Sequence, residues 1–218
     1  MKIICVKILL LFIVTISFLQ LRTVAQPSMG PKVGVSFSTF LPFNFDVQPH
    51  NNVHLPFGVA FNFKAGKVFS FQPELLYIQK GFDFKNYHVN EKYNLNYIEI
   101  PAILKFTFSV QKKINGSFEI GPYFAYLSSI SYMYSDSLAN KGKTVYYPYE
   151  YINLFDVGLG VGIGTAYKTD NGNIALNIRY ECGSFLSYYF IFSGEEMSFL
   201  NSTFSIYLAY MFNLKKPK

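Results

Sequence analysis

Two neighbouring segments, residues 69–81 and 94–106, constrain the fold more than any other part of the chain. Apolar residues alternate with polar or charged ones in both segments, and this period of two is that of a β-strand. The charges keep to one parity: Glu74 and Lys80 share it in the first segment, Glu99 and Lys105 in the second. Each segment is therefore predicted to be a strand with one charged face and one apolar face.

Six further segments alternate in the same way, at residues 32–41, 55–64, 117–134, 152–167, 173–186 and 199–212. Long runs of β-branched and aromatic residues, with no sustained helical period, indicate an all-β chain. Short connections alternate with longer ones, which are predicted at residues 42–54, 82–93, 136–150 and 187–198. The pattern predicts an eight-stranded antiparallel up-and-down transmembrane β-barrel.

The N-terminus has the parts of a secretory signal peptide. A basic start at Lys2 precedes an apolar run of about a dozen residues, which is shorter than a membrane-spanning helix, and small residues follow before Gln26. We expect cleavage after Ala25, so that residues 1–25 are the signal peptide and residues 26–218 the barrel domain. Loss of Lys2, Lys7 and Arg22 lowers the formal net charge from +6 to about +3, which gives no reason to invoke nucleic acid.

Alternation also fits a soluble lipocalin-like barrel, in which the charged face would meet water. Three features favour the membrane version. The charged face carries the small residues, including the glycines at 158, 160, 162 and 164, which a narrow interior needs. The other face has almost no charge, as lipid requires, and tyrosines and phenylalanines gather near strand ends. The composition agrees with these three features, because charged residues are only 15% of the chain, against roughly 25% in soluble domains.

The charges on the inward parity form a set of five acidic and three basic residues: Glu74, Lys80, Glu99, Lys105, Glu119, Asp156, Arg179 and Glu181. They must pair, because an isolated buried charge is very costly. We expect Arg179 to pair with Glu99 or Glu181, and Lys105 with Glu74. A proton or ion path is one interpretation of the set; the one favoured is a structural network that fills the lumen, since eight strands leave room only for side chains.

Three prolines, Pro73, Pro101 and Pro122, lie in the middle of predicted strands. Each removes a backbone donor from the ladder of hydrogen bonds. Local bulges or kinks are therefore expected at these positions.

The segments reading QPELLYIQKG at 72–81 and LNYIEIPAILK at 95–105 resemble the paired motif of the PorT-like outer-membrane β-barrel family. The resemblance extends over the chain after the signal peptide and implies an eight-stranded barrel in the outer membrane of a Gram-negative bacterium. Some members of that family serve secretion and gliding machinery. A departure is the tail at 213–218, because family chains tend to finish at the terminal aromatic strand.

No catalytic, cofactor or metal site is predicted. The alternating glycines from Gly158 lie along a strand with no helix after it, so a nucleotide loop fails its structural context. Metal binding by loop residues is a weak alternative, with the candidate ligands His50, His54, His88, Asp46 and Glu91.

Other features of the sequence are less informative. Cys182 is expected to face lipid, an outer-membrane protease would need a longer chain, and residues 136–138 (Asp-Ser-Leu) resemble an O-glycosylation acceptor. Lysines gather on the short-turn side, at Lys64, Lys67, Lys112, Lys113 and Lys168 and in the C-terminal tail, where they would keep the turns soluble or contact a partner or anionic headgroups.

The prediction for function is a non-enzymatic structural or interaction module of the outer membrane, with the bilayer around it and a protein partner at its loops or its periplasmic rim. The alternatives left open are a channel for a small solute and a soluble lipocalin-like binder.

Overall fold

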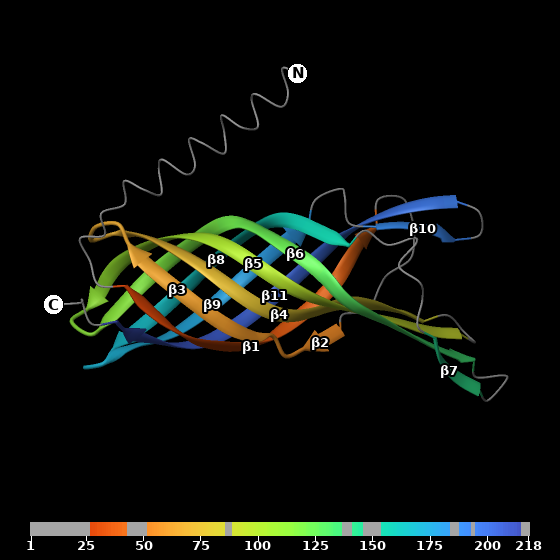
Figure 1. Ribbon diagram of the computed structural model, residues 1–218, viewed down its shortest axis with the longest axis horizontal. Helices are drawn as coiled ribbons and strands as arrows, with labels where there is room; N and C mark the ends of the chain where they lie inside the picture. Colours follow the sequence, from red (N-terminus) through yellow and green to blue (C-terminus); the bar gives the residue numbers. More distant parts are fainter. Residues whose placement is uncertain are drawn as a thin grey trace, which may run out of the picture.

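The computed structural model describes residues 27–42, 52–85, 89–136, 141–145, 154–183, 188–192 and 195–214. These residues form one antiparallel sheet that closes into a barrel (Figure 1). Eight strands build its wall: β1 (Ser28–Pro42), β3 (Phe57–Lys64), β4 (Phe69–Lys85), β5 (Val89–Gln111), β6 (Ile114–Asp136), β8 (Phe155–Lys168), β9 (Gly172–Gly183) and β11 (Glu195–Asn213). The predicted eight-stranded up-and-down barrel is confirmed.

The barrel closes where β11 pairs with β1. The ladder runs from Ser28 opposite Asn213 to Pro42 opposite Phe199, along the whole of β1. No wall strand in the described part of the chain is therefore left with an open edge at this seam, which matters because lipid cannot satisfy free backbone groups.

Three short strands lie at the end of the barrel away from the short turns: β2 (Asn52–His54), β7 (Lys141–Val145) and β10 (Tyr188–Phe192) (Figure 1). β2 continues β3 along β1, since His54 faces Ser36 and Phe57 faces Val33 in one register. β7 pairs with β6, and β10 pairs with β11. The long connections expected from the sequence therefore contain paired strands.

The prediction of a long loop at residues 82–93 is wrong. β4 and β5 remain paired out to Lys85 opposite Asn90, so most of this stretch is a β-hairpin and not a loop. Polar residues such as Asp83 and Lys92 hid this in the sequence, because outside the membrane a strand no longer needs an apolar face.

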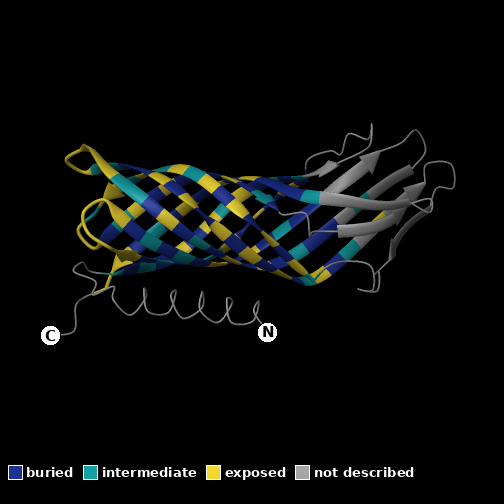
Figure 2. Ribbon diagram, turned by 90° about the horizontal axis from the view of Figure 1, so that it is seen from above, coloured by how far each residue is buried: buried dark blue, intermediate teal, exposed yellow. Residues whose placement is uncertain are grey.

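Side chains alternate between the lumen and the outside along each wall strand, which gives the chequered pattern of Figure 2. Outward positions carry exposed apolar side chains, such as Leu159 at 64% and Ile163 at 59% exposure, whereas the inward Arg179 and Lys80 are fully buried. This orientation is the reverse of the soluble lipocalin-like alternative, in which the charged face would be the exposed one.

The three mid-strand prolines do not produce register shifts. Each coincides with an interruption of two pairs, after which the ladder resumes in the same register: Pro73 between β3 and β4, Pro101 between β4 and β5, and Pro122 between β5 and β6. The prediction of bulges at the prolines is therefore wrong, because the pairing is interrupted there without a change of register. The register shifts between β5 and β6 lie instead at Asn96/Tyr97 and at Ser109/Gln111.

The aromatic residues expected at the membrane boundaries divide into two groups. Tyr77, Tyr167 and Phe212 are exposed on the outside, as expected, but Tyr97 is completely buried in the lumen. It shares the parity of Glu99, so the alternation of its own strand already indicated this. Among the described residues, no helix has the length and hydropathy to cross a membrane.

Candidate functional site: the charged lumen

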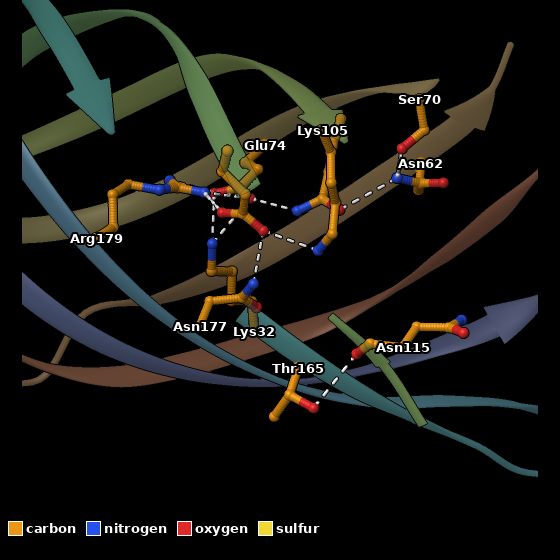
Figure 3. Close-up of polar contacts among 11 residues, drawn as sticks. Lys32, Asn62, Ser70, Glu74, Lys105, Asn115, Thr165, Asn177 and Arg179 are labelled. Atoms are coloured by element: carbon orange, nitrogen blue, oxygen red, sulfur yellow. Dashed lines mark hydrogen bonds and ion pairs between the residues drawn. The ribbon is translucent and has the colours of Figure 1, made fainter. Parts of the chain in front are cut away.

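Glu74 of β4 is the centre of the polar network inside the barrel. Lys32 of β1 donates to both of its carboxylate oxygens, with Nζ at 2.8 and 2.7 Å, and Arg179 of β9 donates from Nη1 at 2.9 Å and Nη2 at 3.0 Å. Gln72 Nε2 donates to Glu74 Oε1 at 2.7 Å. All four side chains are buried, and the two cations reach the carboxylate from different strands (Figure 3).

Arg179 extends the network to Glu119 of β6. Its Nη2 lies 3.2 Å from Glu119 Oε2, while Lys105 Nζ and Asn177 Nδ2 donate to Glu119 Oε1 at 2.8 and 2.6 Å. The guanidinium therefore links two carboxylates that project from the two strands flanking β5, a geometry that suits its planar set of donors.

A second group surrounds Lys80 of β4. Lys80 Nζ lies 2.7 Å from Glu99 Oε2 and 3.2 Å from Asp156 Oδ2. Tyr123 Oη and Asn201 Nδ2 also donate to Asp156 Oδ2, at 3.1 and 2.7 Å. The Lys80 ammonium is 4.2 Å from the centroid of the Tyr123 ring, close enough for a cation–π contact.

Glu181 of β9 is held more loosely than the other carboxylates. Its contact with a cation is the ion pair from Arg179 Nη1 to Glu181 Oε1 at 3.6 Å, and neither oxygen accepts a hydrogen bond although the side chain is 1% exposed. Such a buried carboxylate lacks the donors that usually offset the loss of water.

The glycines of β8 make room for these side chains. A Cβ atom at Gly160 would lie 3.2 Å from Glu181 Cγ and 3.5 Å from Arg179 Cδ. One at Gly158 would overlap the carbonyl oxygen of Cys182 and lie 2.6 Å from Tyr123 Cε1. The glycine stripe is therefore the space into which the lumen residues of neighbouring strands fold.

All eight charged residues predicted to face inward are buried in the lumen. The structure adds Lys32, which sequence reasoning missed although it shares the parity of Gly34 and Ser36. The Arg179–Glu181 pair is present as expected, but the main partners of Arg179 are Glu74 and Glu119 rather than Glu99. The predicted Lys105–Glu74 pair is wrong, because Lys105 lies opposite Glu119 in the β5–β6 ladder and binds it.

The other candidate residues are dispersed. His54 is buried on β2, Cys182 is half-buried on the outward parity of β9, and His50 and His88 fall outside the described residues, as do Asp46 and residues 137–138. No cluster of three or more His, Cys, Asp or Glu side chains suited to a metal ion occurs within the described ranges. Five lysines are exposed at or beside the short turns: Lys64, Lys67, Lys112, Lys113 and Lys168.

Several known proteins are similar to this chain. Among solved structures, the chain is similar to Ail, the attachment invasion locus protein of Yersinia pestis, with 12% identity, a TM-score of 0.43, and coverage of 86% of this chain and 100% of Ail. Neisserial surface protein A has 12% identity and a TM-score of 0.42, with coverage of 85% of this chain and 99% of that protein. OprG from Pseudomonas aeruginosa has 8% identity and a TM-score of 0.46, with coverage of 87% of this chain and 97% of OprG.

No curated protein sequence matches the chain. The family model described as outer membrane protein beta-barrel domain matches residues 24–184, well over half of the chain. A closed barrel with an apolar outer wall and a charged, buried interior is what such a domain requires in a lipid bilayer. The chain belongs to the outer membrane protein beta-barrel domain family.

Proposed function

We propose that this protein is a non-enzymatic structural and interaction module of the outer membrane, whose lumen is filled by side chains and whose strand ends present a surface to a protein partner. The observation that carries the first half is the network around Arg179. It connects β1, β4, β6 and β9 across the lumen through buried ion pairs, at the position where a solute would have to pass.

The length of the strands supports the second half. A membrane-spanning strand needs about 9–11 residues. β5 and β6 each have 23 residues and β4 has 17, so these strands extend well beyond the membrane on the side away from the short turns. A paired ribbon of this kind is a rigid surface for a partner.

The resemblance to PorT-like barrels points to a secretion-machinery component as that partner. The same proposal includes export through a signal peptide at residues 1–25, with residues 26–218 as the working barrel domain. The lysines at the short turns offer a second contact surface, on the periplasmic side.

Conductance in a planar lipid bilayer tests the proposal. The purified barrel, inserted from detergent, is expected to give no steady ion current. Arg179→Ala, which removes the largest fully buried side chain of the lumen, serves as the matched variant and is expected to give current. A steady current through the wild-type protein would overturn the filled lumen and make the small-solute channel the leading function.

Photo-crosslinking in the native membrane tests the interaction. A crosslinker at position 83 or 92, beyond the membrane, is expected to trap a discrete protein adduct. One at the outward position 161, in the middle of β8, is the control and is expected to trap none. Equal adducts at both positions, or none at either, would contradict a partner on the extended strands.

A further inference from the structure

The charges sealed inside the barrel do not balance. The described residues place four cations in the interior, Lys32, Lys80, Lys105 and Arg179, against five carboxylates: Glu74, Glu99, Glu119, Asp156 and Glu181. Each of these nine residues is at least nine-tenths buried. An uncompensated carboxylate in such surroundings is strongly disfavoured, and the usual remedy is uptake of a proton.

The geometry indicates which carboxylates carry the imbalance. Glu74 receives two cations, and Glu119 receives Lys105, Arg179 and Asn177. Glu99 shares Lys80 with Asp156, and Glu181 has the 3.6 Å contact with Arg179 and no hydrogen bond. Glu99 and Glu181 therefore have the weakest compensation.

The negative charges of these two carboxylates also repel each other inside the lumen. The phenol of Tyr207, on β11, interacts with both of them. Its hydroxyl is fully buried and is not hydrogen-bonded to either carboxylate, and the buried hydroxyl of Tyr97 on β5 has no hydrogen-bond partner. Buried polar groups without partners, next to two carboxylates, mark a place where one more proton would be held.

We propose that Glu99 and Glu181 form a proton-binding site in the lumen, which holds one proton between the two carboxylates at neutral pH. The proton removes one negative charge, so the interior becomes neutral, and it turns one carboxylate into a donor. Like-charged carboxyl groups that share a confined site lose their second charge for the same reason in other proteins.

Four titratable or charged groups interact with this site from the surrounding strands: Lys80 from β4, Tyr123 from β6, Asp156 from β8 and Arg179 from β9. Through Arg179 the site is connected to Glu74, Glu119, Lys32 and Lys105. Lys80 and Arg179 favour the ionised carboxylates, whereas Asp156 opposes them. The excess of one carboxylate remains when all of these keep their usual charge.

The proton makes stability depend on pH in a defined direction. At neutral pH the folded barrel holds a proton that both glutamates release when the chain unfolds into water. The folded state then binds more protons than the unfolded one, so its stability falls as pH rises. Glu181→Gln removes the repulsion and the excess charge together, and is expected to abolish this part of the dependence.

Infrared difference spectroscopy of the wild-type barrel in lipid tests the site directly. A protonated carboxyl group has a carbonyl stretch distinct from that of a carboxylate, and it shifts in heavy water. The band is expected at neutral pH in the wild type, and is expected to be lost in Glu99→Gln and in Glu181→Gln. Asp170→Asn, in an exposed turn, is the matched control that keeps it.

Two conservative variants locate the proton even if the glutamate variants fail to fold. Tyr207→Phe is expected to shift the band, because it removes the hydroxyl next to both carboxylates. Tyr123→Phe removes a donor to Asp156 and is expected to leave it unchanged. A band that responds to Tyr123→Phe and not to Tyr207→Phe would place the proton on Asp156 and overturn the proposal.

Absence of the band in the wild type would also overturn it, since the excess charge would then be compensated by another group, such as a protonated His54. The inference rests on the filled lumen of the proposed function, but the two fail separately. A steady current would contradict the filled lumen, whereas the infrared band reports on the carboxyl groups themselves.

Discussion

Glu74 accepts four hydrogen bonds from two buried cations, Lys32 and Arg179, so its removal is expected to destabilise the barrel strongly. Glu74→Gln leaves Lys32 and Arg179 facing each other without their shared counter-charge. Breaking a buried ion pair in this way costs about 3–5 kcal/mol. Urea unfolding in phosphatidylcholine vesicles, followed by the gel-mobility shift of the folded barrel, is expected to show this loss.

Glu181→Gln is the matched comparison, because it is the same chemical change at the most loosely held carboxylate. It is expected to cost much less than Glu74→Gln at neutral pH. Equal losses for the two variants would mean that the distances in the network do not set its energetics.

The glycines of β8 give a second prediction at the scale of the residue. Gly158→Ala drives a methyl group into the carbonyl of Cys182 and the ring of Tyr123, and overpacking of this kind costs about 1–3 kcal/mol. In Gly160→Ala the new methyl group meets the flexible Glu181 side chain at 3.2 Å, which can move aside. Alanine also restricts the unfolded chain, so the stability of this variant is expected to stay within about 1 kcal/mol of wild type. The same urea measurement ranks the two, and the reverse order would contradict the packing described.

Parity along each strand was enough to predict which residues face the lumen, but not which of them pair. Lys105 shows why. A two-residue turn at Lys112 and Lys113 alone would put Lys105 opposite Ile120, on the wrong face. The shift at Ser109/Gln111 moves it opposite Glu119. Nothing in the local sequence announces that shift, so the partner could not be read without the register.

At the scale of the strand, the outer wall should tolerate charge according to depth. Val161 lies near the middle of β8 and faces outward, while Tyr167 faces outward next to the short turn. Arginine costs about 2–4 kcal/mol at the bilayer midplane and about 0–1 kcal/mol near the interface. Val161→Arg is therefore expected to destabilise the barrel by at least 1 kcal/mol more than Tyr167→Arg in vesicle unfolding, and equal costs would argue against lipid at Val161.

The extended part of the β4–β5 hairpin should be dispensable for folding. Replacing residues 83–92 by Asn-Gly joins Phe82 to Tyr93, which already face each other, through a turn that two-residue hairpins favour. The pairs within the membrane are untouched, so the melting temperature and the gel-mobility shift are expected to match wild type. A barrel that no longer refolds would show that the extension is part of the folding unit and not only a surface for display.

The strand pattern predicted the membrane part of each element well and its outer end poorly. Inside the bilayer one face must be apolar, and that requirement is visible as alternation. Further along, charged residues such as Asp83 and Lys92 break the pattern of the membrane part, although the backbone pairing continues. The strands therefore looked shorter, and the loops longer, than they are.

For the whole molecule, the decisive inference was which face lies inside, and it came from the small residues that share a face with the charges. A water-exposed face has no need for glycine at every second position, whereas the lumen does, as the contacts of Gly158 and Gly160 show. The identity of a partner is a property of another molecule's surface, so no pattern within this chain could supply it.

The seam between β1 and β11 sets the order of events during biogenesis. Ser28 and Asn213 are partners although they lie 185 positions apart in the chain, and everything between them must be made before they can meet. Until the last strand leaves the ribosome, β1 has no partner on that side, and a chain ending before β11 would carry two unpaired edges into lipid. Such long-range pairing is slow. A premature stop in the final tenth of the coding sequence should therefore yield a chain that depends on holding chaperones and is cleared by proteases, not a smaller barrel.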